Sequence, residues 1–130
     1  QPILMRLDSD LYDYLHASSE GKLSELPEIS WKNQYSVCVV LASKGYPSSY
    51  PTGDEITGFE NIPSDAFVFH AGTKKQDNKI KSNGGRVLGV TALGSSLQDA
   101  INNAYDACNH IRWTNKYHRT DIGKKGLSNL

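Results

Sequence analysis

The chain has 130 residues, 38% of them apolar, which suits one compact domain with a modest core. Its 14 basic and 14 acidic residues cancel, which argues against a protein that binds nucleic acid or a membrane surface, because such proteins usually carry a basic excess. No apolar stretch approaches the roughly 18 residues that span a bilayer, and no basic segment followed by an apolar one marks a signal peptide.

The first predicted element is a helix over residues 8–21, "DSDLYDYLHASSEG". Asp8 or Ser9 would cap its first amides, and Gly21 would end it. Its apolar face comprises Leu11, Tyr14 and Leu15. Residues 22–33 are polar and are expected to form a connection, which makes them the best candidate for a domain boundary.

A series of strands is predicted next. The clearest covers residues 35–43, "YSVCVVLAS", and its continuous apolar run favours a strand covered on both faces. Residues 44–54 hold two glycines and two prolines and must be a loop. Further strands are expected at residues 55–57, 66–71, 80–82 and 86–93, with residues 72–79 as a hairpin connection and Gly94 as the end of the last strand.

The segment Asn83-Gly84-Gly85-Arg86 allows two interpretations. Asn-Gly is the strongest short turn signal in the chain, because both residues tolerate a positive φ. Alternatively, the glycines expose backbone N–H groups and the arginine offers a forked donor for phosphate or carboxylate. It is not a Walker loop, which needs a lysine and a hydroxyl, and no helix follows directly as in a dinucleotide fingerprint. Spacing alone favours the turn.

The best helix is predicted over residues 96–112. Ser96 and Asp99 are spaced as a capping box. Its apolar stripe indicates core packing and comprises Leu97, Ala100, Ile101, Ala104, Tyr105, Cys108 and Ile111. Residues 113–123 form a polar, aromatic tail. The order of elements predicts an α+β fold, a small β-rich domain with one long helix after a strand series.

Two more segments are candidates for a binding site. His70-Ala71-Gly72-Thr73 ends a strand and either faces a ligand or packs within the sheet. Lys44-Gly45-Tyr46-Pro47 follows the buried strand and is either a functional loop or an ordinary Gly/Pro loop. Arg119 and Asp121 are expected to pair and tie down the tail.

The reactive residues form no complete catalytic set. No histidine pairs with another or with a cysteine at a metal-ligand spacing, and the four are His16, His70, His110 and His118. No nucleophile has an evident base. Cys38 and Cys108 are interpreted as buried thiols, which favours a reducing, cytoplasmic compartment.

Four motifs together resemble one family. They occur in this order and at this spacing: "SKGYPSSYPTGDEI" (43–56), "VFHAGTK" (68–74), "NGGRVLGVTALG" (83–94) and "RTDIG" (119–123). They look like the C-terminal region of glycinamide ribonucleotide synthetase, the phosphoribosylamine–glycine ligase, over essentially all 130 residues. Gln1-Pro2 resembles the end of a family segment, R-F-G-D-P-E-T-Q-P, that precedes a helix. Thr120 departs from the lysine often found there, and the short ending favours a bacterial-type single enzyme.

The resemblance implies an organisation and a reaction. Residues 1–31 would be the tail of an ATP-grasp domain, and residues 32–130 the small C-terminal domain beside it. The reaction would be the ATP-dependent ligation of glycine to 5-phosphoribosylamine, a step of purine biosynthesis, in the cytoplasm. ATP and Mg²⁺ would be bound mainly upstream of Gln1, so that this chain would hold no catalytic or metal-binding residue and would be inactive alone.

The resemblance also implies a substrate-binding role for the glycine loops. They would line the cleft that faces the upstream ATP-grasp portion, with Arg86 as the anion contact. The expected substrate-binding residues are Lys44, Gly45, Tyr46, His70, Gly72, Thr73, Gly84, Gly85 and Arg86. The alternative is a free-standing, β-rich module that binds a sugar phosphate or a partner protein. An exposed apolar face around residues 1–30 would favour the larger enzyme.

Overall fold

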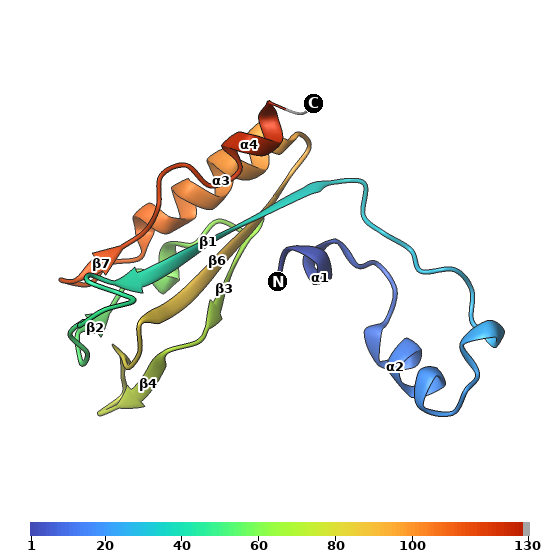
Figure 1. The fold of residues 1–130 in the computed structure, drawn as a ribbon, viewed down its shortest axis with the longest axis horizontal. Helices are drawn as coiled ribbons and strands as arrows, with labels where there is room; N and C mark the ends of the chain where they lie inside the picture. The colour runs from blue at the N-terminus through green and yellow to red at the C-terminus, as the bar shows by residue number, and fades with distance from the viewer. Residues whose placement is uncertain (129–130) are drawn as a thin grey trace.

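A four-stranded antiparallel sheet packed against one long helix forms the body of the molecule (Figure 1). The computed structural model describes residues 1–128. The strand order is β3–β6–β1–β7, with bounds β1 Tyr35–Ser43, β3 Ala66–His70, β6 Arg86–Gly94 and β7 Lys116–Tyr117. Helix α3, Leu97–His110, covers one face of this sheet, the inner face. We call the opposite face the outer face.

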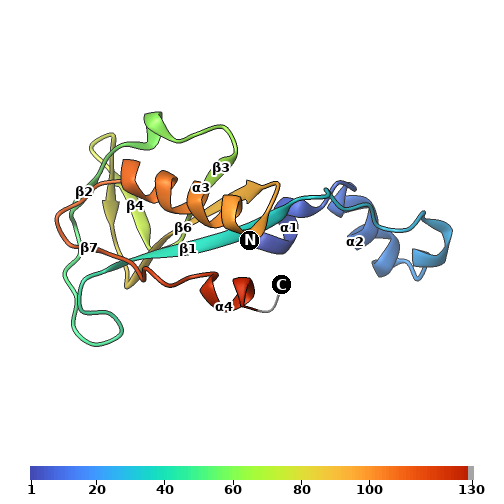
Figure 2. The same cartoon turned by 90° about the horizontal axis from the view of Figure 1, so that it is seen from above.

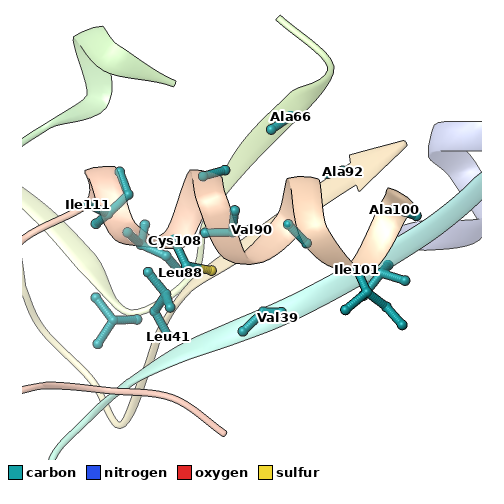
Figure 3. Close-up of a cluster of buried hydrophobic side chains, with 14 of the residues drawn as sticks. Val39, Leu41, Ala66, Leu88, Val90, Ala92, Ala100, Ile101, Cys108 and Ile111 are labelled. Atoms are coloured by element: carbon teal, nitrogen blue, oxygen red, sulfur yellow. The ribbon is translucent and has the colours of Figure 1, made fainter. Parts of the chain in front are cut away.

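The core lies between α3 and the inner face (Figure 3). Alternate residues of β1 point inward, and Val39 and Leu41 are fully buried there. The alanines of α3 are also fully buried, which lets the helix lie close to the sheet. Cys108 packs beside Leu41 and Leu88, and burial raises the pKa of its thiol to about 12. The predicted apolar stripe of the helix is therefore core packing.

The prediction that β1 is covered on both faces is wrong for the described chain. On the outer face Val40 is 44% exposed and Cys38 is only half-buried. The reason is that helix α1, Pro2–Arg6, covers only part of this face, where Gln1 lies against Cys38 and Gly89. The apolar outward residues of β1 thus have only a partial cover.

A second, three-stranded sheet extends from the first. Its order is β2–β5–β4, with β2 Glu55–Ile56, β4 Thr73–Gln76 and β5 Lys79–Ser82. The turn between β4 and β5 is Asp77-Asn78, where both residues have positive φ, 52° and 58°. Residues 72–79, predicted as a connection, therefore contain a strand and the tight turn of the hairpin.

Short helices lie near both ends of the chain. Helix α2, Leu11–Ser19, begins later than predicted because the Asp10 side chain accepts a hydrogen bond from the Tyr12 amide at 2.8 Å and so caps it. Gly21, with φ +71°, follows its end. The sequence did not predict α1 or α4, Lys124–Leu127. Two 3₁₀ turns, η1 Leu23–Glu25 and η2 Phe59–Asn61, are also present. Figure 2 shows α2 extending beyond one end of the sheet, whereas α1 lies alongside β1.

Both ends of α3 are closed by side chains. The predicted capping box is confirmed: Ser96 Oγ accepts from the Asp99 amide at 3.0 Å, and Asp99 accepts from the Ser96 amide at 3.1 Å. At the other end Lys116 Nζ donates to the carbonyl oxygens of Cys108 and Ile111 at 2.8 and 2.6 Å. None of the helices in residues 1–128 has the length and apolarity needed to cross a membrane.

Candidate functional site: a groove on the outer face

A bulge in β6 decides where the Arg86 side chain lies. Leu41 of β1 pairs with Leu88, but the next residue, Ala42, pairs with Arg86, so Val87 is an extra residue on β6. Because Ala42 belongs to the outward set of β1, this shift brings Arg86 to the outer face. With regular alternation, Arg86 would instead pair with Ser43 and point toward the core.

Arg86 and Tyr46 separate two adjoining hollows, which together we call the outer-face groove. The first has a volume of about 450 Å³ and is also lined by Ala71, Gly85 and Gly89. The second has a volume of about 420 Å³ and continues past Pro47 to Tyr117, His118 and Arg119. Val40 lines both. No carboxylate in residues 1–128 forms an ion pair with Arg86, so its charge is available to a ligand.

Buried Ser43 holds the loop that leads into Arg86. Its amide donates to the Gly85 carbonyl at 2.8 Å, and its hydroxyl donates to the Gly84 carbonyl at 2.9 Å. The carbonyls of both glycines are thereby engaged. Within the part of the chain that the structure describes, the amides of Gly84 and Gly85 have no acceptor. Of the two, Gly85 lines the first hollow together with Arg86, and a free backbone donor in the same hollow as a guanidinium suits an anion.

The glycines of this loop are required by close packing. A Cβ on Gly85 would lie 2.1 Å from Cδ2 of the Tyr46 ring. A Cβ on Gly72 would lie 2.9 Å from the Cα of Gly84. Asn83-Gly84 is not a positive-φ hairpin turn, so that interpretation is wrong. The segment instead links β5 of the small sheet to β6 of the large one.

The 44–54 loop enters the groove through Tyr46. Gly45 has φ +101°, and its Cβ position is occupied by the Ser49 carbonyl, so this turn requires glycine. The Lys44 amide donates to the Asn115 carbonyl at 2.8 Å. The Lys44 side chain is exposed and does not line the groove.

His70 and Thr73 lie apart from Arg86. His70 Nδ1 is 3.0 Å from Thr73 Oγ1, and the His70 ring stacks on Phe59 with 5.4 Å between centroids. In the β3–β6 register His70 pairs with Leu88, which belongs to the inward set. The structure therefore brings Tyr46, Gly85 and Arg86 together, places Gly72 and Gly84 behind them, and leaves His70 and Thr73 outside the groove.

The groove residues that the sequence-based set lacks include Tyr117, His118 and Arg119. The expected Arg119–Asp121 pair is confirmed and is bidentate, with Nε 2.8 Å from Oδ1 and Nη2 2.6 Å from Oδ2. This pairing lowers the pKa of the Asp121 carboxyl to about 2. The "RTDIG" motif was the signal that could have placed Arg119 in the site.

His118 contributes no charge to the groove at neutral pH. Burial lowers the pKa of its imidazole, and nearby Lys116 lowers it further. The positive charges of the groove are therefore the guanidinium groups. No three His, Cys, Asp or Glu residues in the described range 1–128 are arranged to hold a metal ion. Another hollow, about 430 Å³, lies between α1 and the start of β1 and is lined by Ile3, Trp31 and Ser36.

Comparisons with known proteins agree with this picture. Over 129 residues the chain is 44% identical to a phosphoribosylamine–glycine ligase of Rhodopirellula baltica, covering 98% of this chain and 30% of that protein. It is 46% identical over 128 residues to a ligase of the same name from Synechocystis sp., with the same coverage. A bifunctional purine biosynthetic protein of Pichia angusta is 42% identical, and there the match covers 16% of the relative.

A solved structure shows the same fold. The crystal structure of a phosphoribosylamine–glycine ligase from Thermotoga maritima superposes with a TM-score of 0.67 at 32% identity, over 83% of this chain and 27% of that one. The chain thus spans about a third or less of the proteins it matches. Residues 36–125 match the family described as "Phosphoribosylglycinamide synthetase, C domain", and the chain belongs to that family.

Proposed function

We propose that this chain is the C-terminal part of a phosphoribosylamine–glycine ligase that acts in the cytoplasm in purine biosynthesis. The reaction forms an amide bond between the glycine carboxyl group and the amine of 5-phosphoribosylamine, while ATP is cleaved to ADP and phosphate. The support is the agreement in sequence and fold with ligases of that name. In this scheme the chain binds substrate and excludes water from the reacting groups.

The outer-face groove is the proposed substrate site. The observation that carries this assignment is the Arg86 guanidinium, which forms no ion pair within residues 1–128 and lines the first hollow together with Gly85, whose amide has no acceptor there. Tyr46 forms the wall between the two hollows. Of the sequence-based set, Lys44, Gly45, His70, Gly72 and Thr73 would act by shaping the loops that surround the groove.

The rest of the enzyme would cover the outer face. Phe67 on β3 is 47% exposed there, and Val40 on β1, across β6, is 44% exposed. Residues 1–31, which we assign to the end of the ATP-grasp domain, also expose apolar side chains, among them Ile3, Leu11 and Leu15. Such surfaces favour a larger assembly over a free-standing binding module. Residues 32–130 would form the C-terminal domain.

ATP and Mg²⁺ belong to the proposed reaction. Residues 1–128 offer no cluster of acidic ligands for Mg²⁺. We propose that both are bound mainly upstream of Gln1.

The test is a joined enzyme, made by replacing the matching C-terminal region of the Rhodopirellula baltica ligase with residues 1–130. We expect ADP release that requires both glycine and 5-phosphoribosylamine. The relative without its C-terminal region is the control and should be inactive. A soluble, folded joined enzyme without this activity would contradict the proposal.

Arg86→Ala in the joined enzyme tests the site. Loss of a charge-assisted contact should raise the KM for 5-phosphoribosylamine by about 10-fold or more. Arg112 is exposed and lines neither hollow, so Arg112→Ala provides the matched control. An unchanged KM in Arg86→Ala would remove Arg86 from substrate binding.

A further inference from the structure

Arg119 lies in the second hollow of the outer-face groove together with Arg86. Tyr46 and Tyr117 line the same hollow, and Val40 and Ala42 form its apolar sheet surface. Tyr117 of β7 pairs with Ala42 of β1, so its side chain also points to the outer face. Two arginines from segments far apart in sequence therefore border one hollow of about 420 Å³.

We infer that Arg119 is a second anion-binding residue of the groove, and that Arg86 and Arg119 together bind the phosphate ester of the phosphorylated substrate rather than the carboxylate of glycine. This inference rests on the proposed function and adds to it a residue and a choice of substrate.

The choice of a phosphate follows from charge and donor number. A phosphate monoester carries nearly two negative charges at neutral pH and three acceptor oxygens, whereas a carboxylate carries one charge and is satisfied by one guanidinium fork. The two guanidiniums are the cationic groups that line this hollow, and the Asp121 carboxylate offsets part of the charge of Arg119, so the number of free donors carries the choice. Asp121 occupies Nε and one N–H of Nη2 of Arg119, which leaves three N–H groups for a ligand.

Arg119 is fixed before any ligand arrives. The Tyr105 hydroxyl donates to the Arg119 carbonyl at 2.9 Å and accepts from the Ile122 amide at 3.0 Å, which anchors the main chain to α3. Asp121 orients the side chain through both carboxylate oxygens. Ordering a long side chain in advance lowers the entropy lost on binding. The pair is exposed, with 67% of the Arg119 side chain accessible, so a ligand can reach it.

The experiment measures binding of ribose 5-phosphate to the joined enzyme by calorimetry, with ribose and glycine as probes without phosphate. We expect Arg119→Gln to weaken ribose 5-phosphate binding about 10-fold or more, while glycine affinity is unchanged. Arg119→Lys keeps the charge but loses the forked donor, so its affinity for ribose 5-phosphate should lie between those of the unsubstituted enzyme and Arg119→Gln. Arg112→Gln is the matched control and should bind like the unsubstituted enzyme.

Asp121→Asn separates binding from structure. It removes the ion pair as Arg119→Gln does, but it leaves the guanidinium in place. If the pair only ties down the tail, the two variants should behave alike. If Arg119 binds phosphate, Asp121→Asn should keep or tighten ribose 5-phosphate binding.

The outcomes distinguish this inference from the proposed function. A joined enzyme that makes product but binds ribose 5-phosphate equally well with Arg119→Gln overturns the inference alone. Absence of ribose 5-phosphate binding to the unsubstituted enzyme overturns it as well. Binding that depends on Arg119 without any ligation supports the inference and contradicts the proposed reaction.

Discussion

The Tyr46 ring lies directly against the backbone of Gly85, where a Cβ would come within 2.1 Å of ring atom Cδ2. Gly85 does not have a positive φ, so an alanine there would meet the ring and not a backbone restriction. The glycine is needed because the aromatic wall of the groove rests on it.

Gly85→Ala should therefore displace Tyr46. We expect it to destabilise the fold by about 1–3 kcal/mol through overpacking and to weaken ribose 5-phosphate binding. Urea unfolding and calorimetry measure the two effects. In a Tyr46→Ala background the same substitution should have much less effect on stability, since the ring is gone. Additive effects of the two changes would show that the contact is not the cause.

The Lys116 ammonium group closes the C-terminal end of α3 through two carbonyl groups. Lys116→Met keeps the aliphatic chain and removes both hydrogen bonds. We expect the free energy of unfolding to fall by about 1–3 kcal/mol, measured by urea denaturation. Lys75 is exposed, and the control Lys75→Met should change the free energy of unfolding by less than about 0.5 kcal/mol. Equal effects of the two substitutions would contradict a capping role.

The Arg119–Asp121 pair should make stability depend on pH at the acid end. The pKa of Asp121 is lowered in the fold, from 3.8 to about 2, so its contribution is present above pH 4 and is lost as the pH falls through about 2. The stability difference between the unsubstituted chain and Asp121→Asn should therefore shrink across that window. Carboxyl NMR titration should show an ordinary Asp121 pKa in Arg119→Gln. A difference that stays constant down to pH 2 would argue against the pair.

Phe67 tests whether the outer face is an interface. It is half-exposed on the edge strand β3, and threonine keeps the preference for strand. Phe67→Thr should change the stability of the 130-residue chain by less than about 1 kcal/mol. In the joined enzyme, the same substitution should lower the thermal midpoint of unfolding by more than it does in the 130-residue chain. A similar change in both would mean that Phe67 remains exposed in the enzyme.

The elements with a strong local signal could be predicted from the sequence. The residues of β1 and the capping box of α3 were identified because apolar runs and Ser-x-x-Asp spacing act locally. The α+β class followed from their order and agrees with the solved relative. By contrast, α1 and α4 are only five and four residues long, too short for a periodic pattern.

The groove could be predicted only in part, because it depends on pairing between distant residues. Arg86 and Tyr46 were expected by resemblance, but which side of the sheet they share follows from the register of β1 and β6. The hairpin turn at Asp77-Asn78 was not predicted, because the Asn-Gly signal at 83–84 is the stronger turn signal. Gly84 instead allows a close approach to the backbone of Gly72, and no local sequence pattern predicts this contact.

The extra residue at Val87 lets two successive residues of β6 be buried. Val87 and Leu88 both belong to the core, while the bulge still leaves Arg86 opposite Ala42 on the outer face. Deleting Val87 would keep Arg86 opposite Ala42, because strict alternation from Leu88 also turns its neighbour outward, but it would remove a fully buried side chain from the core. The position should therefore tolerate exchange of one aliphatic residue for another, and its deletion should lower stability rather than turn Arg86 inward.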